Sequence, residues 1–129
     1  MRTTIGIAVS SLLGSVFGAD VIAAASPTSL EERLDELNYL VGNEAQLIVD
    51  YQLDERVYLD SRHVIVPDAS SGTYLVTLTD SCHGLRSNRV IAWTRTRHEL
   101  APGDTLAPTH QGRRVDECEV ERIHELNVK

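Results

Sequence analysis

The sequence predicts a small, mainly β, single-domain protein: an antiparallel β-barrel or sandwich with one N-terminal helix, stapled by one disulfide. Three observations carry this prediction. Short runs rich in β-branched and aromatic residues alternate with turn residues after residue 43. Helical periodicity is confined to the segment just before them. The chain contains only two cysteines, and both lie in its second half.

The first 25 residues have the layout of an export signal. Arg2 is the positive start, an apolar run covers 5–19, and small residues occupy 23–25, so we predict cleavage after residue 25. Cleavage near Gly18 is the alternative, because Asp20 interrupts the apolar stretch. A membrane anchor is disfavoured, since the run is shorter than the roughly 20 residues that span a bilayer. We therefore expect an exported protein, periplasmic or secreted, with no transmembrane segment in its mature chain.

Removal of residues 1–25 leaves enough chain for one small hydrophobic core but not for two. We assign residues 26–43 to the N-terminal helix and 44–129 to a β-rich domain. The whole chain carries 12 basic and 19 acidic residues, a net charge of −7, which argues against nucleic-acid binding. Acids concentrate in 28–68 and arginines in 86–114, so we expect these two segments to neutralise one another across the fold.

A helix is predicted from Ser29 to Val41. Ser29 and Glu32 have the spacing of a capping box, acids occupy the first turns, and Gly42 marks the end. Apolar residues at helical intervals form one stripe: Leu30, Leu34, Leu37 and Val41. Because this stripe needs a partner, we expect it to form a helix interface with the β domain, a second copy or another protein.

The β domain follows as a series of short strands separated by turns. Residues 46–51 fit a helix and a strand equally well. The runs 57–59 and 63–66 are predicted to form one or two strands, and further strands are predicted at 73–79, 89–97 and 105–107. The strand at 73–79 should form a hairpin with the run before it across the turn at 68–72. Pro102, Gly103 and Asp104 make the turn before 105–107, and a polar loop covers 108–117. The last run, 118–126, fits neither period and is predicted to be a bulged strand.

The clearest chemical prediction from the sequence concerns the two cysteines, Cys82 and Cys118. A disulfide that closes this loop of about 37 residues would stabilise the fold by about 4 kcal/mol on the chain-entropy model. A zinc site that includes His83 and a redox-active thiol pair remain as alternatives. Neither alternative has the Cys-x-x-Cys spacing that usually accompanies it. We predict a disulfide, and we expect no metal site and no cofactor.

No catalytic motif stands out in the sequence. The five histidines are scattered singly: His63, His83, His98, His110 and His124. Asp80, Ser81 and His83 are neighbours, but no Gly-x-Ser-x-Gly nucleophile elbow is present. With 19 acids in the chain, spacing alone does not single out a glycosidase pair. We therefore predict that the protein is not an enzyme.

The strand predicted over 89–97 offers one candidate binding surface. Strand alternation places its basic and aromatic residues on one face: Arg89, Ile91, Trp93, Arg95 and Arg97. If exposed, this face can hold an anionic partner through charge and through stacking on Trp93. We favour the other arrangement, in which Ile91 and Trp93 face the core while the arginine heads reach the rim and pair with the acidic N-terminal half, because a small core can hardly spare its only tryptophan.

Several stretches of the chain resemble a known family. In order, they are Tyr-Leu-Val-Thr-Leu, then Asp80, Ser81, Cys82 and Gly84-Leu85, then Gly103-Asp104, and finally Cys-Glu-Val-Glu-Arg-Ile. Over roughly 51–126 the chain resembles a group of small exported bacterial proteins catalogued only as a domain of unknown function. The resemblance implies a compact, β-rich exported domain with paired cysteines. It implies no activity, substrate or catalytic residue.

These observations favour a non-enzymatic exported module, structural or partner-binding, in the bacterial cell envelope. Its partner would be an envelope protein or an anionic ligand. The alternative is a small-ligand or metal-binding β-barrel protein, which requires a pocket with converging histidines. A hydrolase ranks third, because it requires a concave site with paired acids or with a histidine beside a nucleophile.

Overall fold

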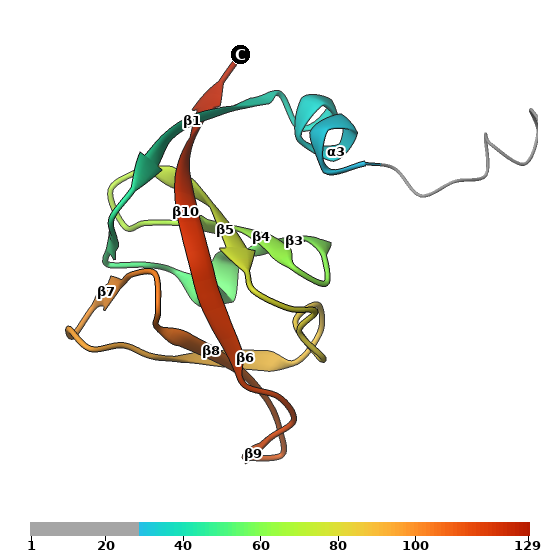
Figure 1. Ribbon diagram of the computed structural model, residues 1–129, viewed down its shortest axis with the longest axis vertical. Helices are drawn as coiled ribbons and strands as arrows, with labels where there is room; N and C mark the ends of the chain where they lie inside the picture. Colours follow the sequence, from blue (N-terminus) through green and yellow to red (C-terminus); the bar gives the residue numbers. More distant parts are fainter. Residues whose placement is uncertain (1–28) are drawn as a thin grey trace, which may run out of the picture.

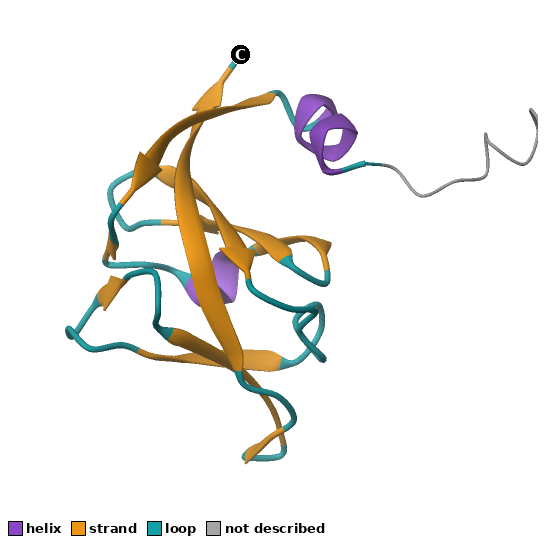
Figure 2. Ribbon diagram, viewed as in Figure 1, coloured by secondary structure: helices purple, strands orange, loops and turns teal. Residues whose placement is uncertain are grey.

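The computed structural model describes residues 29–129, and the predicted export signal lies outside them. The chain forms an antiparallel sheet curled into a half-barrel, with one α-helix at its N-terminal side (Figure 1). Strands dominate the secondary structure, as Figure 2 shows. Within residues 29–129, no helix is long and apolar enough to cross a membrane. The predicted class, mainly β with one helix and one disulfide, is confirmed.

The larger sheet has the strand order β3-β4-β5-β10-β8-β6, and β1 and β9 are added to it by pairing with β10 and β8. Its strands are β1 (Tyr39–Ala45), β3 (Val57–Asp60), β4 (His63–Pro67), β5 (Thr73–Leu78), β6 (Arg89–Trp93), β8 (Thr105–His110), β9 (Arg113–Arg114) and β10 (Cys118–Val128). A second, two-stranded sheet pairs β2 (Ile48–Val49) with β7 (Glu99–Leu100), and a 3-10 turn, η3, covers Leu53–Glu55. The predicted hairpin of β4 and β5 is confirmed.

The helix α3 (Leu30–Glu36) begins as predicted but ends earlier. Its capping box is complete, because the Ser29 hydroxyl accepts from the Glu32 backbone N–H at 3.2 Å and the Ser29 N–H donates to the Glu32 carboxylate at 2.9 Å. Asn38 then adopts a left-handed φ of 65° and turns the chain into β1. The prediction of a helix through Val41, and of a β domain that starts at residue 44, was therefore wrong.

Long-range pairing explains why the helix stops early. Tyr39 pairs with Val128 and Val41 pairs with Leu126, so the end of β10 draws this segment into the sheet. Gly42 is not a helix stop. A Cβ there would lie 3.2 Å from the Glu125 carbonyl oxygen and would also displace the Asn127 side chain, so glycine favours the close approach of β1 to β10 at a bulge.

The predicted leucine stripe does not form a single interface. Leu34 is buried beneath the helix, whereas Leu37 is 44% exposed and Val41 is 49% exposed in β1. Leu30 packs at the margin of the same cluster as Leu34. The helix therefore docks on the sheet mainly through Leu34.

Two hydrophobic clusters lie on opposite faces of the sheet. The larger cluster has 14 buried residues from both arms of the curl and fills its interior. The smaller cluster has five buried residues, Leu34, Leu59, Ile65, Leu75 and Leu126, and lies under α3.

Strand β10 joins the two clusters. It contributes Val120 and Ile123 to the larger cluster and Leu126 to the smaller one. A register shift against β5 between Val120 and Arg122 confirms the predicted bulge. The bulge explains why the apolar residues of this strand fit no strict period.

Two predicted boundaries in the second half were wrong. Strand β6 ends at Trp93 and does not continue to Arg97. The segment predicted as a polar loop over 108–117 instead contains the end of β8 and the strand β9, which pair as a hairpin. The turn at Gly103 forms as predicted, with a φ of 94° that favours glycine.

Candidate functional site

The predicted disulfide between Cys82 and Cys118 is confirmed, with a Cα–Cα distance of 5.7 Å. It joins the loop after β5 to the start of β10, and both cysteines are buried. Within residues 29–129, these two residues and Asp116 are grouped closely enough to suggest a metal site. Both sulfurs are consumed in the bridge, and the Asp116 carboxylate accepts the His83 backbone N–H at 2.8 Å. The donor set therefore does not fit a metal ion in this state.

The histidines are not gathered into a site. His83, His98 and His110 are exposed in separate segments, and His63 contacts Asp60 through its Nδ1 at 2.8 Å. His124 Nδ1 is buried without a hydrogen-bond partner. Within residues 29–129, no metal-ligand group contains two histidines. Ser81 contacts Ser61, with 3.0 Å between the hydroxyl oxygens, and this pair contains no general base.

The outward face of β6 carries the candidate binding surface. Arg89, Ile91 and Trp93 are exposed, while Val90 is buried in the larger cluster. The predicted alternation therefore holds over the observed strand. Trp93 is 41% exposed and Ile91 is 38% exposed, so the predicted arrangement in which both face the core was wrong.

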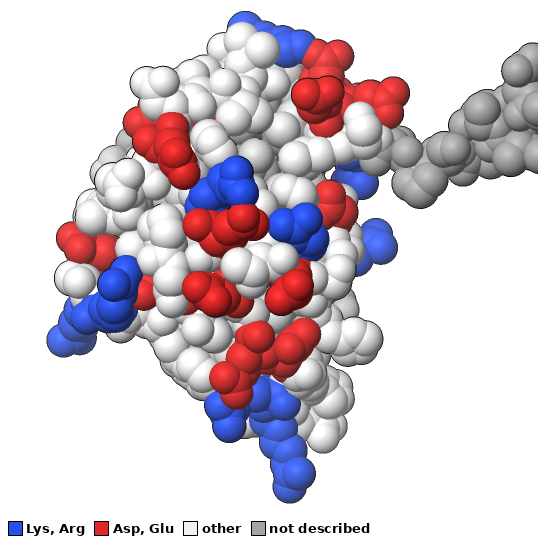
Figure 3. All heavy atoms as spheres, viewed as in Figure 1, with Lys and Arg blue, Asp and Glu red and all other residues white. Residues whose placement is uncertain are grey.

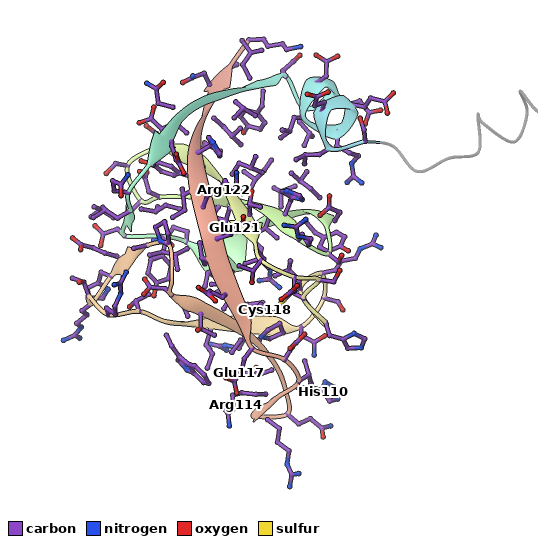
Figure 4. The ribbon with its side chains drawn as sticks, viewed as in Figure 1. His110, Arg114, Glu117, Cys118, Glu121 and Arg122 are labelled. Carbon is purple, nitrogen blue, oxygen red and sulfur yellow. A yellow bond between two sulfur atoms is a disulfide. The ribbon has the colours of Figure 1, made fainter. Side chains whose placement is uncertain are left out.

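Arg114 completes this surface. Its guanidinium carbon lies 5.0 Å from the centroid of the Trp93 ring, within the range of a cation–π contact. Its Nη1 donates to the Glu117 carboxylate at 2.7 Å, and Figure 4 shows these two side chains near β9. We define the Trp93 face as Arg89, Ile91, Trp93 and Arg114.

Strand register places both arginines of the Trp93 face on one side of the sheet. Arg89 pairs with Thr109 on β8, and Thr109 pairs with Arg114 on β9. Directly paired residues project to the same side of a sheet. The two guanidinium groups therefore belong to one surface, although they are 25 positions apart in the chain.

Sequence reasoning missed Arg114 because it assigned 108–117 to a loop. The available signal was the pair Gln111-Gly112 between two β-compatible segments. Their φ angles of 53° and 79° are those of a two-residue hairpin turn with left-handed conformations at both positions. Recognition of this turn would have predicted β9 and brought Arg114 opposite Thr109.

Arg95 and Arg97 do not extend the Trp93 face. The Arg95 backbone N–H and Nε donate to the buried Asp104 carboxylate at 3.3 and 3.4 Å, and its Nη2 donates to the Pro102 carbonyl at 3.0 Å. Arg97 is exposed in the turn after Thr96. Arg95 thus stabilises the turn before β8, and the continuous basic strand predicted from the sequence is not formed.

The predicted neutralisation of the acidic first part by the basic middle was also wrong. Within the part of the chain that the structure describes, six ion pairs form: Arg62–Glu121, Asp60–His63, Arg95–Asp104, Arg114–Glu117, Glu121–Arg122 and Asp35–Lys129. None joins an acid of 28–68 to an arginine of 86–114. Figure 3 instead shows acidic and basic groups interspersed over the visible surface.

Glu121 illustrates this local pairing on β10. Its carboxylate lies between the Arg122 and Arg62 guanidinium groups. The hydrogen bond from Arg122, together with the charge of both arginines, holds the pKa of Glu121 below its usual range despite partial desolvation. In turn, Glu121 raises the pKa of Arg122. The group is a surface ion network.

A shallow groove of about 270 Å³ adjoins the Trp93 face. It runs along the edge of β6, between residues 89–92 and the segment 51–54, which includes the first two residues of η3. Within residues 29–129, β6 pairs only with β8, so this edge carries no other strand. Arg89 belongs to both the groove and the Trp93 face, and a chain laid on the face can therefore continue into the groove.

Comparisons with known proteins place this chain in a family. Neither a curated protein nor a solved structure matches it. The family model DUF6491, described as a family of unknown function, matches residues 2–129. This match includes the helix, which lay outside the predicted resemblance over 51–126. The chain belongs to DUF6491, a family of unknown function.

Proposed function

We propose that this protein is a non-enzymatic, exported module that binds an acidic segment of a protein partner in the cell envelope through the Trp93 face. One observation carries the proposal. The only tryptophan of the chain lies 41% exposed beneath an arginine, although the domain has few aromatic residues with which to build a core. Tryptophan and arginine are the side chains most enriched at the energetic centres of protein interfaces.

The geometry of Arg114 suits it to bind carboxylates. Stacking on Trp93 and the bond to Glu117 hold its guanidinium in place, so little side-chain entropy is lost on binding. A guanidinium has five N–H donors, and a partner carboxylate can use those that Glu117 leaves free. Arg89 offers a second guanidinium on the same side of the sheet. Ile91 and Trp93 supply the apolar area beside them.

A partner carboxylate that uses two donors of Arg114 can also displace Glu117 from Nη1. Both side chains are about half exposed, at 53% and 54%, so their mutual attraction is screened by salt and is weak. The exchange therefore costs little. Binding should weaken as ionic strength rises, since it depends on charge as well as on apolar contact.

The export part of the proposal has two supports. A disulfide persists mainly in oxidising compartments outside the cytosol, and this chain has one between buried cysteines. The first 25 residues have the order of charge, apolar run and small residues found in export signals. An intact mass of protein from the exported fraction, matching residues 26–129 less two hydrogens, is the expected result. A mass that retains residues 1–25 would contradict it.

Trp93 provides the direct test of binding, because it is the only tryptophan. A hexaglutamate peptide titrated into the oxidised protein should change the Trp93 emission, and hexalysine should not. Arg89→Ala/Arg114→Ala should weaken binding by about tenfold, the scale of an interface centre. A matched control, Arg97→Ala/Arg113→Ala, removes the same charge from residues outside the Trp93 face and should retain affinity within about twofold. Equal weakening in both double variants would show only general charge attraction and would refute the proposed face.

A further inference from the structure

A second surface, at the opposite end of the curled sheet, has a different character. A groove of about 290 Å³ lies between α3 and the start of β1. Its apolar lining comes from both elements: Leu34, Tyr39, Leu40 and Val41. Figure 1 shows α3 beside β1 and the C-terminal end of β10. We call this surface the α3–β1 groove.

The α3–β1 groove is bordered by exposed apolar side chains. Leu37, Leu40, Val41 and Val128 are 44%, 53%, 49% and 76% exposed. They are four of the ten large apolar residues exposed between residues 29 and 129, and pairing of β1 with the end of β10 gathers them at one end of the molecule, with Leu40 on the opposite face of β1 from Val41 and Val128. A gathered apolar surface is typical of an interaction site, whereas single exposed apolar residues are not.

The backbone of β1 is also available at this end. Among residues 29–129, β1 pairs with β10 alone, so its other edge has no neighbouring strand. The bulge between Val41 and Glu44 distorts the rest of β1, which disfavours pairing of another strand there. Tyr39–Val41 is therefore the part of β1 that can accept another extended chain, and it adjoins the groove.

The charges around the groove specify what kind of chain fits. Helix α3 carries Glu31, Glu32, Asp35 and Glu36, and only Asp35 has an ion-pair partner, Lys129, within residues 29–129. The helical Arg33 is directed to the Tyr58 carbonyl at 3.5 Å. Of these charged groups, Glu31, Asp35 and Lys129 line the groove, and because Asp35 and Lys129 pair with each other, Glu31 leaves a negative charge at the rim of the apolar groove.

We infer that the α3–β1 groove binds an extended basic segment of a partner polypeptide, which adds to the edge of β1 at Tyr39–Val41. In this arrangement the backbone of the segment pairs with β1, and alternate apolar side chains enter the groove. Its basic side chains face Glu31 on α3. A second copy of this chain fits less well, because two acidic helices would meet.

Fluorescence anisotropy of a labelled Lys-Val-Lys-Leu-Lys-Val-Lys peptide tests this inference. The oxidised Arg89→Ala/Arg114→Ala variant, whose Trp93 face no longer takes acidic peptides, should bind it, and should bind Glu-Val-Glu-Leu-Glu-Val-Glu at least about tenfold more weakly. The basic peptide N-methylated at alternate residues should also lose about tenfold or more, because strand addition needs its backbone N–H groups. Equal affinity of the methylated peptide would overturn strand addition.

Paired variants locate the binding site. Leu40→Ser/Val41→Ser should weaken binding of the basic peptide by about tenfold. Val49→Ser/Val57→Ser is the matched control, since these valines are 49% and 44% exposed on other strands, and it should retain affinity within about twofold. Far-UV circular dichroism and urea midpoints should show that both variants fold. Equal weakening in the two variants would refute the α3–β1 groove as the site.

The readouts separate this inference from the function proposed above. Binding at the α3–β1 groove should survive Arg89→Ala/Arg114→Ala, and hexaglutamate binding should survive Leu40→Ser/Val41→Ser. Sedimentation across a range of concentrations tests whether a second copy of this chain occupies the α3–β1 groove instead. A dimer that Leu40→Ser/Val41→Ser abolishes, without binding of the basic peptide, would assign the groove to a second copy and overturn the inference.

Discussion

The two hydrophobic clusters of this protein are built on opposite faces of one sheet, and they differ in how they are closed. The larger cluster has 14 buried residues, is enclosed by both arms of the curl, and contains the disulfide. The smaller cluster has five and is covered mainly by a helix of seven residues that docks through Leu34. A helix this short is not stable by itself, so its presence depends on that contact.

The difference shows that one strand, β10, can contribute residues both to an enclosed cluster and to a cluster covered by one short helix. The bulge in β10 lets Ile123 face the larger cluster and Leu126 the smaller one. We therefore expect the larger cluster to carry most of the global stability. The smaller cluster should open locally at a lower free energy than global unfolding. Because α3 forms one side of the α3–β1 groove, this opening would also change the shape of the groove.

Removal of the disulfide should have the largest effect. Cys82→Ala/Cys118→Ala should lower the free energy of unfolding by about 4 kcal/mol, because the unfolded chain regains the entropy of a long open loop. Urea denaturation followed by far-UV circular dichroism measures this loss. A loss below about 1 kcal/mol would show that the bridge adds little to the enclosed cluster.

A matched pair of truncations compares the clusters directly. Leu106→Ala, at a residue with no exposure in the larger cluster, should cost about 3 kcal/mol. Leu34→Ala should cost about 2 kcal/mol, since α3 can detach and let the site relax. Amide hydrogen exchange should show α3 unprotected in Leu34→Ala while β5 stays protected. Equal costs, with α3 still protected, would contradict the proposed difference.

Trp93 tests whether a large side chain outside both clusters contributes to stability. Trp93→Ala should cost less than about 1 kcal/mol, well below the loss from a buried tryptophan, because the ring is 41% exposed. The same variant should abolish hexaglutamate binding when a labelled peptide is followed by anisotropy. A large loss of stability would instead assign Trp93 to the structure of β6 and β8.

The smallest expected effect concerns pH. Burial, and next the charge of Asp68 with its hydrogen bond, raise the pKa of Tyr74 above its ordinary value. The unfolded chain therefore loses the phenol proton first, and the stabilisation present below about pH 10 is lost as pH rises through the folded pKa. Urea midpoints between about pH 9 and 11 should fall less steeply in Tyr74→Phe than in the natural chain. Identical slopes would show that Tyr74 does not control this loss.

Local signals in the sequence were sufficient for much of the fold. The capping box at Ser29, the β4–β5 hairpin and the turn at Gly103 each depend on residues a few positions apart, and all three form as predicted. The cysteine pairing was accessible for a different reason. With two cysteines in the chain, a disulfide within it has only one connectivity.

The candidate sites were harder to predict from the sequence than the fold. The pattern placed Arg89 and Trp93 on one face, but the scarcity of aromatic residues favoured burial of Trp93, and that prediction was wrong. The register of β6, β8 and β9 places Arg114 on the Trp93 face. Arg95 is not part of this face, because it donates to the buried Asp104 carboxylate instead. These outcomes depend on contacts between segments that no periodicity links.

The sequence by itself determined the mainly β class, the helix start, the local turns and the disulfide, because each depends on short-range chemistry or on a count of residues. Only the tertiary structure decided that Tyr39–Ala45 is a strand, that Trp93 is exposed, and that Arg114 lies over the Trp93 ring. The physical reason is that strand pairing and burial are set by partners far along the chain. Val128 and Leu126 pair with the segment whose own periodicity predicted a helix, and their hydrogen bonds and packing outweigh that local preference.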